Sequence, residues 1–150
     1  MSNLTVKILE QPDSEIIAAV AALEEEAFGR GGLNEWHLPV IARHGRLVVI
    51  IEAERVIGAA SLLKDWAGNS AFLFDLVIAG DVRGRGCGRY LMEKTIENLR
   101  NEGFKRLELT VAPDNNAAVD FYERLGFERT GLLPGEYGLG QDRLAMTLTL

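Results

Sequence analysis

Apolar and polar residues follow a strand-like pattern in six segments of the chain. In these segments apolar residues alternate with polar ones or form short continuous runs, as is typical of strands. The segments are residues 4–9, 46–52, 55–64, 70–78, 105–111 and 143–150. Because the turn-like segments 53–54 and 65–69 separate three of these strands, we expect residues 46–78 to form an antiparallel meander.

Between the predicted strands, apolar residues recur at helical spacing. This spacing predicts helices at residues 15–28, within 33–45, from 87 to about 101, and at 115–125. Asp13 or Ser14 is expected to cap the first helix, which should end at Gly29 before a flexible glycine-rich loop. The last helix is expected to start at an Asp or Asn cap and to close at Gly126.

The order of these elements predicts the fold class. After the meander the chain reads helix, strand, helix, strand, so the helix at 87–101 crosses over between two strands of one sheet. We therefore expect an α/β fold with a mixed sheet. A chain of 150 residues is long enough to bury one substantial core, so we expect a single domain over residues 1–150.

The stretch VRGRGCGRYLMEKTI, Val82 to Ile96, places three glycines at alternate positions between arginines, directly before a helix. The first backbone N–H groups of a helix lack intrahelical partners and attract anions, and glycine lets a phosphate approach the backbone closely. The alternative is a surface turn before an ordinary helix. A P-loop is excluded because the chain contains no Gly-Lys pair, and the glycine spacing does not fit a Rossmann fingerprint.

Composition narrows the choice of ligand. The formal net charge of −6 argues against nucleic acid as a partner, while the arginines of the glycine-rich stretch fit a small anionic ligand. The single cysteine, Cys87, excludes an internal disulfide, and we expect it to fit the loop rather than to react. His37 and His44 form no recognisable metal site, so no metal is expected. No apolar run is long enough to span a membrane and the N-terminus does not resemble a signal peptide, so we expect a cytoplasmic protein.

Two motifs together resemble one known family. Arg83-Gly84-Arg85-Gly86-Cys87-Gly88 resembles the acetyl-CoA signature of the GNAT superfamily of N-acetyltransferases, Arg/Gln-x-x-Gly-x-Gly/Ala. The later stretch NNAAVDFYERLGF resembles the second motif of that superfamily, with Asn115, Ala118, Tyr122, Gly126 and Phe127 at matching positions. The order of the remaining elements is also similar, so the resemblance covers essentially the whole chain.

The resemblance implies a mostly antiparallel sheet with helices on both faces, splayed at a V-shaped cleft that holds acetyl-CoA as co-substrate. The backbone of Leu76 to Ile78 would pair with the pantetheine arm, and the backbone from Arg83 to Arg89 would bind the diphosphate. Arg85 and Arg89 would supply charge, and the Asn115 amide would contact the arm. The implied cofactor-binding residues are Leu76, Val77, Ile78, Arg83, Gly84, Arg85, Gly86, Cys87, Gly88, Arg89, Asn115 and Tyr122.

In the implied reaction a neutral amine attacks the thioester directly, and Tyr122 protonates the departing thiolate. The alternative for Tyr122 is an aromatic core residue. The general base stays open, because Thr110 stands where similar protein N-terminal acetyltransferases carry a glutamate. Asp75, which burial could make basic, and Glu108 are the candidates on the strands. A base acting through water, or the glutamates Glu25, Glu26 and Glu35, which otherwise form a solvated surface, are further alternatives.

The resemblance implies an N-acetyltransferase whose acceptor is a primary amine. The stretch GEYGLGQDRLAM resembles the loop and final strand of ribosomal-protein alanine acetyltransferases, with Tyr137, Asp142 and Met146 at matching positions, although Glu136 replaces one of their two tyrosines. The acceptor is therefore either a protein N-terminus or a small amine. A binding protein that senses acetyl-CoA without catalysis is the alternative function. Exposed sheet edges would permit a homodimer.

Overall fold

In the computed structural model, residues 3–150 are described, and they form two compact units. Unit 1 contains the described residues up to Leu63 together with Leu73–Glu97, and unit 2 contains Lys64–Phe72 and Asn98–Leu150. The strands are β1 (Leu4–Leu9), β2 (Arg46–Glu52), β3 (Arg55–Lys64), β4 (Ser70–Ile78), β5 (Arg106–Val111), β6 (Glu128–Leu133) and β7 (Arg143–Thr149). The helices are α1 (Ser14–Phe28), α2 (Leu38–His44), α3 (Cys87–Asn101) and α4 (Asn116–Arg124), with short 3₁₀ helices η1 (Gly29–Gly31) and η2 (Gly80–Val82).

The strands follow the order β1-β2-β3-β4-β5-β7-β6, and β4 contributes residues to both units. Strand β4 runs parallel to β5, as expected for two strands joined by a crossover helix, and the ladder pairs Ser70–Phe72 with Arg106–Glu108. The neighbouring pairs β1–β2, β2–β3, β5–β7 and β6–β7 are antiparallel. The prediction of a mixed, mostly antiparallel sheet is therefore confirmed.

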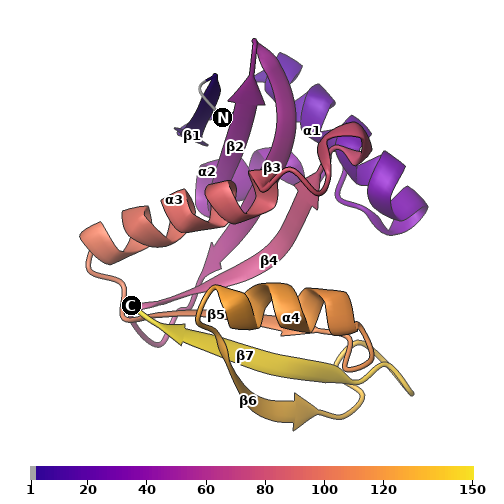
Figure 1. Cartoon of the computed structure of the whole chain (residues 1–150), viewed down its shortest axis with the longest axis vertical. Coiled ribbons are helices and arrows are strands. Elements are labelled where there is room, and N and C mark those ends of the chain that lie inside the picture. Colours follow the sequence, from indigo (N-terminus) through magenta and orange to yellow (C-terminus); the bar gives the residue numbers. More distant parts are fainter. Residues whose placement is uncertain (1–2) are drawn as a thin grey trace. The chain divides into compact units, whose positions relative to one another are not determined.

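In unit 1, β2 and β3 form a hairpin whose two-residue turn has Ala53 and Glu54 at positive φ, the backbone geometry that matches strand twist. Asp13 caps α1 by accepting hydrogen bonds from the backbone N–H groups of Glu15 and Ile16, so the cap is Asp13 rather than Ser14. Helix α2 tolerates Pro39 because proline lies in its first turn, where no backbone donor is needed. In Figure 1, α3 passes in front of the strands of unit 1 and α2 lies behind them.

In unit 2, β7 pairs with β5 on one side and with β6 on the other. Asn115 caps α4, which lies in front of β5 in Figure 1. The helix ends before Gly126, whose φ of 103° suits glycine. The N–H of Phe127 then donates a hydrogen bond to the carbonyl of Tyr122. These contacts confirm the predicted start and end of this helix.

Two predicted details differ from the structure. Strand β6 has no counterpart among the predicted strands, because it is polar and mostly exposed and its pairing shifts register between Arg129 and Gly131. The segment after Gly29 is not simply a flexible loop, since it contains η1 and the backbone N–H of Gly32 donates to the carbonyl of Gly29. Gly32 also packs so closely on α1 that a Cβ there would lie 2.8 Å from the carbonyl oxygen of Glu24.

The large buried side chains are aliphatic residues from both units, among them Leu47, Ile57, Leu91, Leu107 and Met146. Their burial supplies the main folding energy of each unit. Among residues 3–150, no helix is long and apolar enough to cross a membrane. A single domain over residues 1–150 stays a prediction.

Candidate active site

The glycine-rich stretch forms a loop that connects β4 to α3 in unit 1. Gly84 and Gly86 have φ values of 79° and 82°, a region that glycine adopts without strain. A Cβ at Gly84 would meet no atom within 4 Å, so the space beside this backbone is open. Because α3 begins at Cys87, its unpaired N–H groups and the positive end of its dipole lie at this loop. The binding of a phosphate group by this loop stays a prediction.

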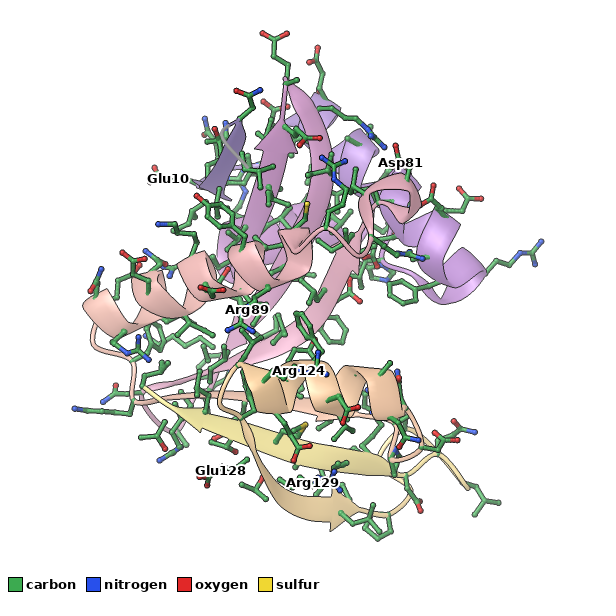
Figure 2. The ribbon with its side chains drawn as sticks, in the orientation of Figure 1. Glu10, Asp81, Arg89, Arg124, Glu128 and Arg129 are labelled. Atoms are coloured by element: carbon green, nitrogen blue, oxygen red, sulfur yellow. The ribbon has the colours of Figure 1, made fainter. Side chains whose placement is uncertain are left out.

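Arginine side chains of the loop and of the first turn of α3 form ion pairs with neighbouring groups of unit 1. Arg85 forms an ion pair of 3.2 Å with Glu52, and Arg89 forms one of 2.9 Å with Glu93, so neither guanidinium lacks an acidic partner. Both pairs are more than half exposed on the arginine side, so each contributes little to stability. The backbone geometry, more than these side chains, distinguishes the loop. Arg89 is labelled in Figure 2.

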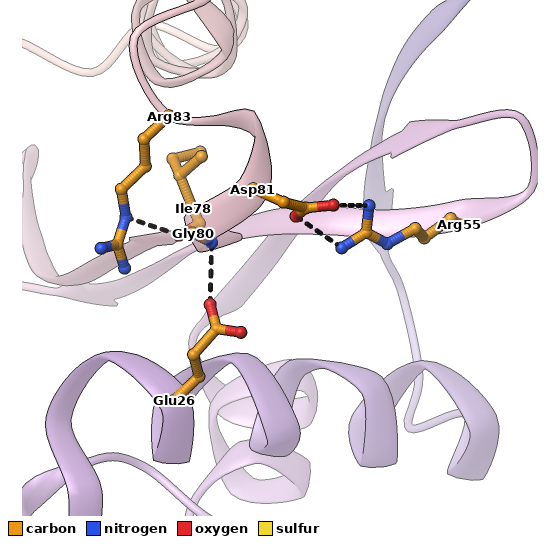
Figure 3. A network of polar contacts seen from close by, with 6 residues as sticks. All are labelled: Glu26, Arg55, Ile78, Gly80, Asp81 and Arg83. Atoms are coloured by element: carbon orange, nitrogen blue, oxygen red, sulfur yellow. Dashed lines mark hydrogen bonds and ion pairs between the residues drawn. The ribbon is translucent and has the colours of Figure 1, made fainter.

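A network of polar contacts fixes the approach to the loop (Figure 3). Glu26 of α1 accepts a hydrogen bond of 2.7 Å from the backbone N–H of Gly80, and Arg83 donates through Nε to the carbonyl of Ile78. Arg55 binds both carboxylate oxygens of Asp81 at 2.8 Å and holds the pKa of that carboxyl below its ordinary value. Glu26 therefore holds the backbone that precedes the loop in position.

The last residues of β4 come directly before Gly80 and Asp81 of this network in the chain. Val77 is buried, Leu76 and Ile78 are half-buried, and the N–H of Ala79 donates to the carbonyl of Ile57 on β3. Gly58 of β3 permits this close approach, since a Cβ there would lie 2.8 Å from the carbonyl oxygen of Val77. The pairing of this backbone with a pantetheine arm stays a prediction.

Asp75 and Glu24 form a pair of carboxyl groups in unit 1. Glu24 is 1% exposed, and its Oε1 accepts a hydrogen bond of 2.8 Å from the backbone N–H of Leu33. Its Oε2 is buried without a hydrogen-bond partner among residues 3–150. Burial, and then the adjacent carboxyl group of Glu24, raise the pKa of Asp75 to about 9. The chain thus holds a carboxyl group that releases its proton in the same range as an amine.

Glu108, the other predicted base, has a different environment. It is half-buried on β5 and forms an ion pair of 3.2 Å with Arg106 on the same strand. Thr110 lies two residues further along the same face. Its hydroxyl and carbonyl oxygens accept hydrogen bonds of 3.1 and 2.9 Å from Arg143, so a cation stands beside this position.

The two predicted site residues of α4 have structural contacts. Tyr122 is 9% exposed, and its ring packs edge-to-face against Phe121 and Phe127. Asn115 uses its side-chain oxygen to cap the helix at Ala118 N–H. These contacts agree with the alternative that Tyr122 is a core aromatic residue, and they leave its role as an acid a prediction.

Sequence reasoning missed one residue in each unit, Glu24 in unit 1 and Arg143 in unit 2. Glu24 stands in the run Glu24-Glu25-Glu26, which is typical of a solvated helix end. Its spacing from Val20 and Ile17 nevertheless places it on the buried face of α1. The sequence pattern identifies Arg143 only as the first residue of the last strand. Its contacts depend on Thr110 and Tyr137, which are distant in sequence and therefore could not be inferred from spacing.

Comparison with solved structures identifies the fold. Ard1 from Thermoplasma volcanium matches with a TM-score of 0.85 at 20% identity, covering 99% of this chain and 98% of that chain. The expected GNAT fold is therefore confirmed.

Curated relatives give the sequence relationship. N-alpha-acetyltransferase 30 of Schizosaccharomyces pombe is 32% identical over 97 residues, covering 63% of this chain and 65% of that protein. The ribosomal protein bS18-alanine N-acetyltransferase of Salmonella typhimurium is 34% identical over 85 residues, covering 55% of this chain and 57% of that protein. The chain thus spans less than two thirds of the length of these two relatives.

A third relative aligns over more of its length. The L-methionine sulfoximine/L-methionine sulfone acetyltransferase of Pseudomonas aeruginosa is 30% identical over 118 residues, covering 73% of this chain and 68% of that protein. The profile of the acetyltransferase family matches residues 15–127, which is more than half of the chain and includes both motifs. This chain belongs to the Acetyltransferase (GNAT) family.

Proposed function

We propose that this protein transfers the acetyl group of acetyl-CoA to a primary amine. The observation that carries the proposal is the loop before α3, where Gly84 and Gly86 have positive φ and open space lies beside Gly84. Family membership supports acetyl-CoA as the ligand of this loop. The backbone N–H groups of the loop and of the first turn of α3 would hold the diphosphate.

The reaction forms an amide bond and breaks the carbon–sulfur bond of the thioester. The amine must first lose a proton, because only a neutral nitrogen has the electron pair that attacks the carbonyl carbon. As the amide forms, the nitrogen loses a second proton, and the thiolate that leaves gains one proton, for which Tyr122 stays the proposed donor. The amide, the free thiol and one proton released to solvent balance the reaction.

Asp75 is the proposed general base. A carboxyl group whose pKa lies near 9 binds a proton almost as strongly as a primary amine does, so transfer from the ammonium costs little free energy. Asp75 must be ionised to accept that proton, and the rate of acetyl transfer should therefore rise with pH toward 9. Glu24 would act as a positioning residue, since it raises the pKa of Asp75 and also holds the backbone of Leu33.

The relatives support an amine acceptor of either class. By their names, one acts on the alanine of a ribosomal protein and another on L-methionine sulfoximine or sulfone, so they include protein and small-molecule acceptors. A homodimer and a cytoplasmic location stay predictions.

Calorimetry with acetyl-CoA tests the loop that carries this proposal. Gly86→Val should weaken binding at least tenfold, because a valine at a φ of 82° strains the backbone that would bind the diphosphate. Gly103→Val is the matched control, since Gly103 has a φ of 88° and no atom within 4 Å of its Cβ position, but follows the end of α3. Equal affinities in both folded variants would remove the assignment of the loop to the diphosphate.

A further inference from the structure

Arg143, at the start of β7, has its guanidinium fixed from two sides within unit 2. Nε donates to the hydroxyl of Thr110 at 3.1 Å, and Nη2 donates to the carbonyl of the same residue at 2.9 Å. The guanidinium carbon lies 4.4 Å from the centre of the Tyr137 ring, which covers one face as in a cation–π contact. The Tyr137 hydroxyl is 3.5 Å from the Thr110 hydroxyl, which closes the cluster.

The loop that carries Tyr137 is itself held in place. The N–H of Tyr137 donates to the carbonyl of Gln141, and the N–H of Gln141 donates to the carbonyl of Gly138. Asp142 accepts a hydrogen bond of 2.8 Å from the backbone N–H of Gly135. The nearest acid along the chain is therefore engaged with the loop backbone, and the ring of Tyr137 stays in position over Arg143.

These contacts leave one edge of the guanidinium available. Thr110 occupies the edge formed by Nε–H and one Nη2–H. The remaining N–H groups, on Nη1 and on the outer side of Nη2, point away from that edge in the parallel arrangement that binds a carboxylate with two hydrogen bonds. The site therefore has donors of fixed direction.

Within the described part of the chain, Arg143 also lacks the carboxylate partner that five other arginines have. Within residues 3–150, no carboxylate pairs with Arg143, although it is half-buried. Carboxylates do pair with Arg55, Arg85, Arg89, Arg106 and Arg129. A half-buried cation whose partners are neutral is stabilised by an anion from outside the chain.

We infer that Arg143 binds a carboxylate group of the amine acceptor. The acceptor is then an amine that also bears a negative charge, either a free amino acid or a protein N-terminus with an acidic side chain. Assignment of this anion to the acceptor rests on the proposed function. The anion site itself rests only on the contacts of Arg143.

A binding experiment tests the anion site without any turnover. The probes are N-acetylglycine and N-acetylglycinamide, which differ in one group, a carboxylate or a neutral amide. In a nuclear magnetic resonance titration of the whole protein, N-acetylglycine should shift the Arg143 Nε and Thr110 amide resonances in a saturable manner. N-acetylglycinamide should not shift these resonances.

Two variants identify the residue that binds the carboxylate. Arg143→Gln should abolish the Thr110 shift. Arg129→Gln is the control and should leave the shift unchanged, because Arg129 is an exposed residue of β6 that pairs with Glu123 (Figure 2). Equal shifts with both probes, or none with either, would overturn the inference.

A rate experiment tests whether the anion belongs to the acceptor. Free amino acids are compared with their primary amides, and peptides with glutamate as second residue are compared with their glutamine counterparts. Wild-type protein should show a KM at least tenfold lower for the charged member of one of these pairs. Arg143→Gln should remove that difference in KM between the charged and the neutral member, and Arg143→Lys should keep part of it.

The two experiments separate the ways of failing. Carboxylate binding at Arg143 without acetylation of any amine would leave the anion site standing and would contradict the proposed function. Acetylation with equal KM values for charged and neutral acceptors would keep the proposed function and would overturn the assignment of the anion to the acceptor.

Discussion

Among the candidate site residues, Asp75 has a strongly raised pKa. A carboxyl group that is half-buried beside Glu24 stays protonated at neutral pH, although it ionises readily when the chain unfolds. The folded protein therefore binds one more proton at this residue than the unfolded protein over the range between the two pKa values.

This difference predicts a pH-dependent effect of Asp75→Asn on stability. The pKa of Asp75 is raised from 3.8 to about 9 in the folded state, so its contribution is fully present below about pH 4 and is lost as pH rises toward 9. Asparagine has no proton to lose. The variant should therefore gain free energy of unfolding relative to wild type as pH rises, by at least about 1 kcal/mol at pH 8.

Urea denaturation at several pH values between 4 and 9 measures this gain. Asp120→Asn on the exposed side of α4 is the control and should give a nearly constant difference. A constant difference for Asp75→Asn as well would show that Asp75 ionises normally in the folded protein.

Tyr122 gives a second prediction at this scale. Tyr122→Phe removes one hydroxyl group and keeps the ring that packs against Phe121 and Phe127, so folding and acetyl-CoA binding should persist. If the hydroxyl protonates the thiolate, kcat should fall by about 10²–10⁴-fold. Tyr90→Phe, which keeps the ring beside Lys94, should have little effect. Nearly full kcat in Tyr122→Phe, with chemistry rate-limiting, would make Tyr122 a packing residue.

At the level of single residues, the sequence indicates candidates where a motif names them. The glycine spacing indicates Gly84 and Gly86, which have positive φ, and phosphate binding by their loop stays a prediction. Glu24 and Arg143 were missed, because their importance comes from partners such as Asp75 and Thr110 that only the fold brings near. Local pattern carries no information on such pairs.

At the scale of elements, the sequence predicted those with strong periodicity. The predicted bounds of β2, β3 and β4 agree with the structure, because apolar runs between clear turns leave little choice. Helix α3 was also placed correctly, since glycines precede it and Gly103 follows it. Strand β6 could not be predicted, because Glu128–Leu133 are mostly exposed and hydrogen bonding to β7, rather than apolar pattern, makes them a strand.

The pairing of strands could likewise be predicted only where the strands themselves have a clear sequence pattern. The hairpin of β2 and β3 could be predicted because only two residues separate the strands. The position of β7 between β5 and β6 could not, since β6 itself was not predicted. Tertiary pairing of weakly patterned strands requires the structure.

At the scale of the whole molecule, the proposed activity is transfer of the acetyl group of acetyl-CoA to a primary amine. Family membership, the open backbone of the loop before α3 and the basic carboxyl group of Asp75 each support one part of this reaction. A protein that only senses acetyl-CoA would need the loop but not the general base that we propose for Asp75.

The most direct measurement is the release of free CoA thiol from acetyl-CoA in the presence of a panel of amines, with acetylated amine quantified by mass spectrometry. The panel contains free amino acids, their amides, polyamines and short peptides with free N-termini. The account predicts thiol release that depends on at least one amine, matches acetylated product in amount and increases with pH toward 9. Tight binding of acetyl-CoA with no amine-dependent thiol release across the panel would contradict it.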